Sequence, residues 1–403
     1  MYPHQTIFDM AINWDSQRIP VRASERKKGP YPYYGAQGIV DYVDDYIFDG
    51  FYILVAEDGE NLRSQKENVA TLASGKFWVN NHAHVISSKP HCNTKYIFYA
   101  LSDIDFTSYI TGSTIPKLSQ ASLGNIELPC PSLEVQDAIA SILGSLDDKI
   151  DLNRRTNETL EAMARALFRD WFVDFGPTRA KMAGEAPYLA PELWELFPDR
   201  LDDEGKPEGW NFSSIYDVAS VIYGAPFASG LFNNQSEGIP LVRIRDLPSE
   251  KPGVWTTEVH PKGFKILPGM IVVGMDGEFR AHLWGGEEAW LNQRVCIFKP
   301  KDGISSVFLR ETITPQLKFI EDTEVATTVI HLGKGDIDAF NTLVPNHGIM
   351  ASFNDLVQFY YDKIVLNKQE SRTLSGLRDL LLPKLMSGEI SIRDAEKMVE
   401  DAA

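Results

Sequence analysis

The sequence predicts an α+β protein built as an internal repeat: two similar mixed α/β domains separated by two long antiparallel coiled-coil helices. Three observations lead to this fold class. A hydrophobic heptad pattern covers residues 134–175, a second pattern matches it at an offset of 214 residues, and the segments before the two patterns share short motifs. Such self-similarity indicates a duplicated unit, with a pseudo-two-fold relation between its halves.

The first domain is expected at residues 1–133 and has mixed α/β character. Residues 51–56 are a short apolar run that Glu57-Asp58-Gly59-Glu60 closes, as in a buried strand that ends in a turn. Residues 77–86 alternate between apolar and polar side chains and predict another strand. Residues 96–101 predict one short helix.

Residues 134–175 predict a central helix. Apolar and amide side chains recur at alternating spacings of four and three residues, which is the pattern of a helix that packs lengthwise on another helix. Since the average helix has about three turns, this one is unusually long. At about 1.5 Å per residue it spans roughly 48 Å. The seam residues are Ile139, Leu143, Leu146, Ile150, Asn153, Asn157, Leu160 and Leu167.

Residues 176–212 predict an irregular connector, because they contain five prolines and 8 acidic against 4 basic residues. The second domain follows at residues 213–348 and repeats the first in outline. Asp276-Gly277-Glu278 follows an apolar run as Asp58-Gly59-Glu60 does, and Trp290-Leu291-Asn292 corresponds to Trp78-Val79-Asn80.

Residues 349–386 predict the second spacer helix. Its seam residues are Phe353, Val357, Tyr360, Ile364, Asn367, Leu374 and Leu381. Asn153 and Asn367 occupy the same seam position, and a polar residue there fixes the register of a helix pair. Antiparallel pairing would place Asn157 near Asn367 and Asn153 near Ser371. We expect the tail, residues 387–403, to be ordered only in part.

Composition excludes several classes of protein. No window approaches 18 apolar residues, so we expect no membrane-spanning helix. The first twenty residues lack the basic start and apolar run of a signal peptide. The three cysteines, Cys92, Cys130 and Cys296, are widely spaced and form no C-x-x-C motif. This spacing fits the reducing cytoplasm and argues against a zinc ribbon.

The net charge of −17 would ordinarily count against a nucleic-acid-binding protein. Residues 1–133 hold 11 basic and 14 acidic groups, and residues 213–348 hold 12 and 16, so any DNA contact must come from local patches. Arg can donate two hydrogen bonds to the edge of a guanine base, and Lys mainly makes an ionic contact with phosphate. The candidate DNA contacts are Arg22, Arg26, Lys27, Lys28, Lys66, Lys76, His82, His84, Arg243, Arg245, Arg280, His282 and Arg294.

These segments together resemble the specificity (S) subunits of type I restriction-modification systems. In the first domain and spacer the resemblance lies in Pro32-Tyr33-Tyr34-Gly35-Ala36-Gln37-Gly38, Glu57-Asp58-Gly59, Asp147-Asp148-Lys149-Ile150 and Leu167-Phe168-Arg169-Asp170-Trp171-Phe172. Further on it lies in Pro207-Glu208-Gly209-Trp210, Gly274-Met275-Asp276-Gly277, Leu291-Asn292-Gln293-Arg294 and Leu380-Leu381-Leu382-Pro383. Residues 1–28 depart from the usual opening of the family.

This resemblance implies a non-catalytic subunit that reads a bipartite double-stranded DNA target, one half with each domain. It implies recruitment of two adenine-methyltransferase subunits and, through them, restriction and translocase subunits. S-adenosylmethionine, ATP and Mg would then belong to those partners. The spacer length would set the gap between the half-sites. A non-enzymatic protein–protein adaptor on the same helical rod is the alternative, and the acidic net charge favours it.

A search for chemistry of the chain's own finds no S-adenosylmethionine loop, no Asn-Pro-Pro-aromatic motif and no P-loop sequence. His82, His84, His91 and Cys92 could be imagined as a metal site, but base contact or structural use is favoured. Pro198-Asp199 with Glu204-Gly205-Lys206 faintly resembles a nuclease motif without a strand around it. Phe168, Phe172 and Phe175 could form an exposed apolar patch for a partner, or pack under the second domain.

Overall fold

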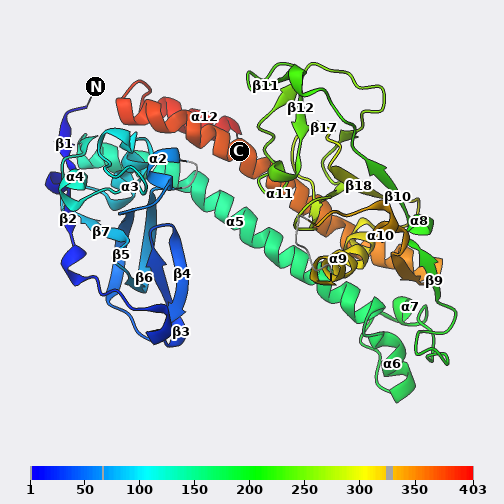
Figure 1. Cartoon of the computed structure of the whole chain (residues 1–403). Helices are drawn as coiled ribbons and strands as arrows, with labels where there is room; N and C mark the ends of the chain where they lie inside the picture. Colours follow the sequence, from blue (N-terminus) through cyan, green and yellow to red (C-terminus); the bar gives the residue numbers. More distant parts are fainter. Residues whose placement is uncertain (1, 66–67, 324–329, 403) are drawn as a thin grey trace. The chain divides into compact units, whose positions relative to one another are not determined.

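The computed structural model describes residues 2–65, 68–323 and 330–402, and the chain divides into two compact units (Figure 1). Unit 1 contains Met1–Ile150 together with Arg372–Ala403, and unit 2 contains Asp151–Ser371. Unit 1 therefore draws on two distant segments of the chain, whereas unit 2 is a single continuous segment.

A six-stranded mixed sheet forms the centre of unit 1, with strand order β2-β7-β5-β6-β3-β4. Strands β3 and β6 run parallel, and the other four neighbouring pairs are antiparallel. A separate antiparallel pair joins β1 and β8. The strands are β1 (His4–Thr6), β2 (Ala11–Asn13), β3 (Lys28–Gly35), β4 (Gly38–Val43), β5 (Phe48–Ala56), β6 (Ala70–Val79), β7 (Ala83–Ser88) and β8 (Glu127–Pro129).

The strand predicted at residues 51–56 is the buried end of β5. The single strand predicted at residues 77–86 is wrong, because β6 ends at Val79 and β7 begins at Ala83. Between them the Asn80 side chain accepts a hydrogen bond from the backbone N–H of His82 (2.8 Å). An Asn that bonds the backbone two residues on favours a turn, so the chain reverses there.

Side-chain caps begin three of the short helices of unit 1, which are α1 (Ile7–Met10), α3 (Thr94–Ser102) and α4 (Gln120–Gly124). Helix α2 (Asn61–Ser64) lacks such a cap. In α3 the Asn93 side chain accepts a hydrogen bond from the backbone of Tyr96 and satisfies a free N–H group. Tyr96, Ile97 and Leu101 are fully buried, so α3 covers the core, and the helix predicted at residues 96–101 is confirmed.

Unit 2 contains a four-stranded antiparallel sheet, β10-β18-β15-β16, and a five-stranded sheet, β11-β13-β12-β17-β14. Strand β9 (Asn211–Ser214) pairs with β19 (Asn341–Val344). The sheet strands are β10 (Ala219–Tyr223), β11 (Phe232–Asn233), β12 (Ile239–Val242), β13 (Trp255–Thr256), β14 (Lys265–Ile266), β15 (Ile271–Gly274), β16 (Ala281–Leu283), β17 (Ala289–Leu291) and β18 (Val295–Pro300). The helices of the domain are α8 (Ile215–Val218), α9 (Ser306–Thr323) and α10 (Lys334–Asp338).

The strand pairings of unit 2 repeat those of unit 1. Val55 faces His84 across β5 and β7, and Val273 faces Cys296 across β15 and β18. The pairs β2·β7 and β1·β8 recur as β10·β18 and β9·β19. Even the parallel pair recurs, as β3·β6 in unit 1 and β12·β17 in unit 2. The chain is therefore a structural duplication, as its sequence predicts.

The two spacer helices are α5 (Leu133–Phe172) and α11 (His347–Ser387). In unit 1 the first part of α5, with Leu143, shares a core with the last part of α11, with Leu381. In unit 2 the last part of α5, with Trp171, shares a core with the first part of α11, with Phe353. Early residues of one helix thus pack with late residues of the other, and the predicted antiparallel arrangement is confirmed.

Burial follows the heptad seam closely. The fully or almost fully buried seam residues, each at most 5% exposed, are Ile139, Leu143, Leu146, Asn153, Phe353, Val357, Ile364, Asn367, Leu374 and Leu381. Those of intermediate burial are Ile150, Asn157, Leu160, Leu167 and Tyr360. Next to Tyr360, Tyr361 is 2% exposed and is the more deeply buried of the two.

The connector and the tail are more ordered than expected. Helices α6 (Gly176–Ala183) and α7 (Pro191–Trp194) lie in the connector, and Trp194 and Phe197 are buried. The tail forms helix α12 (Ile392–Ala402), in which Ala395 is fully buried in the core of unit 1. The expectation of a partly ordered tail missed the apolar face of α12, since every third or fourth residue there packs inward.

Candidate nucleic-acid interface

Amide side chains bridge α5 and α11 in the middle of the spacer. Asn153 Nδ2 donates hydrogen bonds to Glu370 Oε2 (2.8 Å) and Ser371 Oγ (3.2 Å). Asn367 Nδ2 donates one to Asn157 Oδ1 (2.8 Å). These are the two contacts that antiparallel symmetry predicts. Because a buried amide without a partner is costly, the pairs penalise any shift of register.

In each unit a trio of side chains ties the domain to both spacer helices. In unit 1, Asp147 of α5 accepts hydrogen bonds from Tyr99 Oη of α3 and from Arg378 Nη1 of α11, both at 2.7 Å. Burial, and then the hydrogen bond to Asp147, raise the pKa of Tyr99 far above its ordinary value, so that its proton stays in place.

The trio of unit 2 has different members. Arg310 of α9 donates from Nη1 to Tyr361 Oη of α11 (3.3 Å) and lies 3.3 Å from Glu161 Oε1 of α5. Burial raises the pKa of Tyr361 to about 12. In both units an acid, an arginine and a tyrosine connect one helix of the domain to α5 and α11, so each domain is fixed to its part of the spacer.

The basic run at residues 22–28 lies before and at the start of β3. Arg22, Lys27 and Lys28 are exposed. Arg26 is held more firmly, since its guanidinium stacks over the Tyr33 ring (4.2 Å) and Nη1 reaches Asp41 Oδ2 (3.2 Å). Four cations within seven residues make a local basic patch in an acidic chain, and this patch stays a predicted DNA contact.

Two further lysines belong to the predicted set in the first domain. Lys76 is exposed on β6, with Nζ 4.5 Å from the centre of the Tyr46 ring. Lys66 lies outside the described residues.

His82 and His84 do not share a face, because only His84 belongs to β7. His82 is 52% exposed in the preceding turn and its Nδ1 lies 2.7 Å from Asp58 Oδ2. His84 is 1% exposed, with Nδ1 2.6 Å from Asp15 Oδ2 and Nε2 2.9 Å from the Leu118 carbonyl oxygen. With no exposed ring atom to offer, His84 is corrected from a DNA contact to a core residue.

His84 belongs to a buried polar network in unit 1. Arg18 Nη1 lies 2.8 Å from Glu57 Oε2, and Asp15 Oδ1 also accepts a hydrogen bond from the backbone of Val85 (2.8 Å). Burial alone would raise the pKa of Asp15, but the hydrogen bond and charge of His84 bring it below its ordinary value. The pKa of Glu57 is likewise lowered, because its bonds to Arg18 and Lys117 outweigh burial.

The predicted contacts of the second domain fall into two groups. Arg245 and Arg294 are exposed. Arg243 is bound to Asp246, with Nε 3.0 Å from Oδ2. Arg280 is bound to Glu321, with Nη1 2.5 Å from Oε2. The carboxylates at Arg243 and Arg280 lie 3.0 Å away or closer, whereas the one at Arg294 is 3.7 Å away, so Arg245 and Arg294 are the more available cations.

His282 is half-buried on β16. Burial, and then the charges of Lys368 and Arg310, lower the pKa of His282 to about 4. The ring is therefore neutral near pH 7 and brings no positive charge to a phosphate. Its place near Lys368 of α11 fits domain packing better than the DNA contact expected from sequence.

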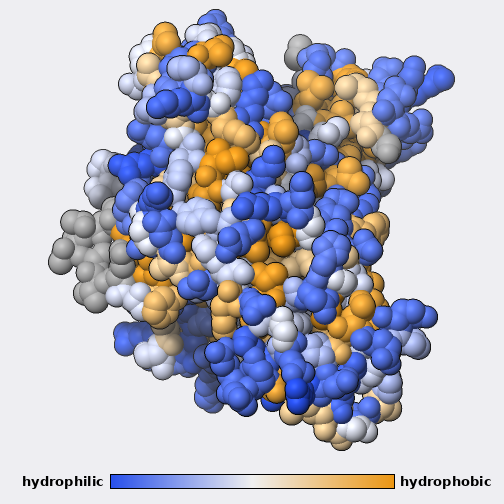
Figure 2. All heavy atoms as spheres, turned by 90° about the vertical axis from the view of Figure 1, so that its right-hand side faces the viewer, coloured by the Kyte–Doolittle hydropathy of each residue, from blue (hydrophilic) through white to orange (hydrophobic). Residues whose placement is uncertain are grey.

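The apolar end of α5 is covered rather than exposed. Phe172 is 6% exposed, with its ring centre 4.8 Å from that of Phe353 and 5.1 Å from that of Phe308. Phe168 and Phe175 are of intermediate burial in the same cluster. Of the two predicted alternatives, packing under the second domain is therefore the correct one. Hydrophobic and hydrophilic residues are interspersed on the face shown in Figure 2.

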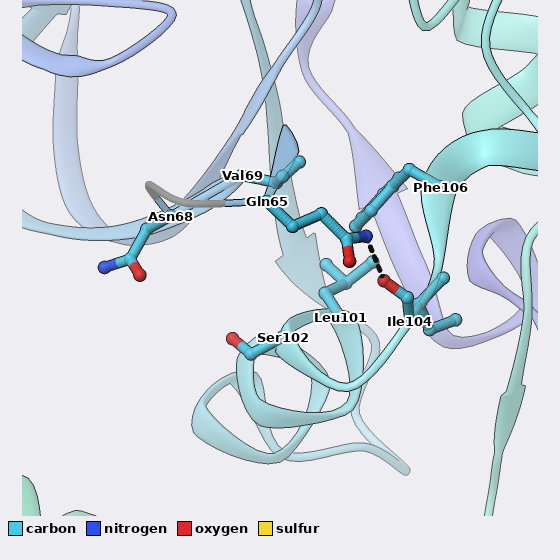
Figure 3. A pocket seen from close by; sticks show the side chains of 7 residues that line it. All are labelled: Gln65, Asn68, Val69, Leu101, Ser102, Ile104 and Phe106. Carbon is cyan, nitrogen blue, oxygen red and sulfur yellow. Dashed lines mark hydrogen bonds between the residues drawn. The ribbon is translucent and has the colours of Figure 1, made fainter. Parts of the chain in front are cut away.

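A small cavity of about 160 Å³ in unit 1 is drawn in Figure 3. It lies between α3 and the start of β6, and Gln65 Nε2 donates across it to the Ile104 carbonyl oxygen (2.8 Å). Among the described residues that line it, none carries a charge. Within residues 2–65, 68–323 and 330–402, no group of three His, Cys, Asp or Glu side chains is arranged to hold a metal ion. None of the helices described is both long and apolar enough to cross a membrane.

Comparison with known proteins shows which family the chain resembles. The model of the type I restriction modification DNA specificity domain matches residues 6–162. The chain is similar to the specificity subunits of type I restriction enzymes. It is 28% identical to the MjaIX specificity subunit of Methanocaldococcus jannaschii, covering 80% of this chain and 75% of that one. To the HindI specificity subunit of Haemophilus influenzae it is 26% identical, covering 76% and 81%.

A solved structure supports the fold of this chain. The S subunit of a type I system from M. genitalium superposes with a TM-score of 0.60 at 14% identity, covering 96% of both chains. At that identity the likeness concerns the fold alone.

Two basic residues beside the Asp-Gly turns, Lys117 and His331, are absent from the contacts predicted from sequence. Lys117 pairs with Asp58 and His331 pairs with Asp276, and each comes from a segment more than 50 residues further along the chain. No local pattern marks them.

Proposed function

We propose that this specificity subunit reads a bipartite double-stranded DNA target, with one recognition domain for each half. The observation that carries the proposal is the repeated strand register of the two domains, each followed by a spacer helix. Repeated modules suit repeated half-sites on a helical ligand. The predicted DNA contacts Arg22, Lys27, Lys28, Arg245 and Arg294 are exposed and available for this role.

The subunit is proposed to be non-catalytic and to recruit two adenine-methyltransferase subunits, and through them restriction and translocase subunits. S-adenosylmethionine, ATP and Mg would be bound by those partners, which is consistent with the absence of the corresponding sequence motifs. A cytoplasmic location follows from contact with cellular DNA.

Equivalent leucines support docking of two like partners on the spacer. Leu152 of α5 and Leu366 of α11 stand at the offset of 214 residues and are 49% and 58% exposed. A leucine pointing to solvent at the same repeat position on both helices gives two copies of one partner equivalent contacts. Leu152→Glu with Leu366→Glu should therefore reduce the number of methyltransferase subunits that co-purify.

The deciding experiment maps methylated adenines in DNA exposed to the chain assembled with its methyltransferase partners. We expect one two-part motif with a fixed gap. Deleting seven residues from each spacer helix removes about 10 Å, or roughly three base pairs, and should shorten that gap accordingly. An unchanged gap would refute the spacer as a ruler, and methylation by the purified chain alone would refute a non-catalytic role.

If the assembled complex neither shifts nor methylates any DNA, the alternative of a protein–protein adaptor stands. The net charge of −17 is the observation that favours that alternative.

A further inference from the structure

The same three backbone segments meet at the Asp-Gly turn in both domains. In unit 1 the N–H of Glu57 donates to the His82 carbonyl (2.9 Å) and the N–H of Leu118 donates to the Glu57 carbonyl (2.8 Å). An isolated antiparallel bridge joins Asp58 to Lys117. The strand end, the β6–β7 turn and the segment around Lys117 are therefore fixed together.

In unit 2 the same bonds recur with other residues. The N–H of Met275 donates to the Arg294 carbonyl (2.9 Å), and the N–H of Leu332 donates to the Met275 carbonyl (2.8 Å). An isolated bridge joins Asp276 to His331. By this backbone correspondence Asp276 replaces Asp58, Arg294 replaces His82, and His331 replaces Lys117.

In both units the aspartate holds at least one of the basic side chains. His82 Nδ1 lies 2.7 Å from Asp58 Oδ2 in unit 1. In unit 2, His331 Nδ1 lies 2.7 Å from Asp276 Oδ1, and Arg294 Nε lies 3.7 Å from Asp276 Oδ2.

The four basic side chains stay open to solvent. Their exposed fractions are 52% for His82, 55% for Lys117, 55% for Arg294 and 45% for His331. Surface ion pairs of this kind contribute at most about 1 kcal/mol to folding. Stability therefore gives little reason to build one arrangement twice from different residues.

We infer that these two clusters are equivalent DNA-contact points, one in each recognition domain, formed by His82 and Lys117 in the first and by Arg294 and His331 in the second. Asp58 and Asp276 are positioning residues that restrict the basic side chains before DNA arrives. The shared aspartate keeps the geometry, while the differing partners let the two domains read different half-sites. This inference rests on the proposed function.

Arg294 is the strongest reader of the four. Its Nη1 lies 3.3 Å from His331 Nδ1, and its Nη2 has no hydrogen-bond partner among the described residues. A guanidinium held in this way can fork onto the O6 and N7 atoms of guanine. Lys117, which shares Glu57 with Arg18, suits a phosphate contact.

The test uses the full chain assembled with its methyltransferase subunits and the target duplex mapped above. Arg294→Ala should weaken binding by about tenfold to a hundredfold. His82→Ala and Lys117→Ala should each weaken DNA binding by about fivefold. Where the lost contact was to a phosphate, the slope of log affinity against log salt concentration should also fall in magnitude by about one. The matched controls are Arg200→Ala and His4→Ala, which remove exposed side chains outside both clusters and should change binding less than twofold.

The positioning role has its own readout. Asp276→Asn should weaken DNA binding less than Arg294→Ala does, and it should leave the salt dependence of the affinity unchanged. Asp276→Glu, which keeps the carboxylate, should bind DNA like the unmodified complex. If Arg294→Ala and His82→Ala both bind within twofold of the unmodified complex, the inference is wrong while the proposed function stands. If the unmodified complex binds no DNA, the proposed function itself fails.

Discussion

The two recognition domains have similar strand pairings but differ in the side chains at equivalent core positions. In unit 1 the position that faces Val55 is His84, at the centre of a buried polar network. In unit 2 the equivalent position faces Val273 and is Cys296, fully buried among apolar side chains. Glu57 of the network likewise corresponds to Met275, which is 6% exposed.

This difference teaches which interactions set the fold. Four strand pairings recur in both units, although the residue opposite Val55 belongs to a polar network and the residue opposite Val273 lies among apolar side chains. The register therefore depends on backbone pairing and on the alternation of inward and outward residues. Side-chain chemistry inside the core has been free to diverge, and the following experiments address that divergence.

The largest effect is expected at His84. His84→Leu removes one hydrogen-bond partner of the buried Asp15 carboxylate, which keeps the Val85 N–H and Arg18. It should lower the free energy of unfolding by about 3 kcal/mol, the lower end of the loss when one partner of a buried charge is removed. The matched change in unit 2, Cys296→Ala, deletes one apolar atom and should lower it by about 1 kcal/mol. Chemical denaturation of both variants checks this, and equal losses would show that the two cores do not differ as described.

A smaller effect is expected where the domains join the spacer. Asp147→Ala leaves Arg378 and Tyr99 without their shared acceptor and should lower the free energy of unfolding by about 2 kcal/mol. Tyr361→Phe in unit 2 removes a single hydrogen bond and should lower it by about 1 kcal/mol. Thermal melts of these variants check the two expected losses. Asp148→Asn, at a carboxylate whose side chain is 77% exposed, serves as the control and should leave the melting temperature unchanged.

The smallest difference depends on pH. The pKa of Asp15 is lower in the folded chain than its ordinary value of about 3.9, so its charge stabilises the fold at pH values above that. This contribution is lost as the pH falls through the folded pKa. Asp15→Asn should therefore be less stable than the unmodified chain at pH 7, with the gap narrowing from about pH 5 towards pH 3. Denaturation midpoints at pH 7, 5 and 3.5 measure the gap; Asp203→Asn, at an exposed carboxylate, should show no such trend.

Sequence alone was sufficient for the elements that local periodicity specifies. The seam residues of α5 and α11 repeat every three or four positions, so their burial could be read from spacing. The amide contacts of Asn153 and Asn367 followed from antiparallel symmetry. The turn at Asn80 was also readable, because adjacent asparagines favour a reversal, but the alternation around it concealed the break.

Other features depend on residues far apart in the chain. The burial of His84 is explained by Asp15 and Leu118, which lie 69 and 34 positions away. Phe172 is covered by Phe308 from a helix of the second domain. A single sequence carries no local sign of such contacts, so an exposed role was expected for His84 and was one of two alternatives for Phe172.

The make-up of unit 1 has a consequence during protein synthesis. Its core includes Leu374, Leu385 and Ala395 as well as residues of the first domain. A ribosome that has passed residue 371 has synthesised all of unit 2, yet the domain made earlier still lacks part of its interior. The second domain can therefore finish folding first, and a nonsense codon shortly after residue 371 would damage the domain encoded at the opposite end of the gene.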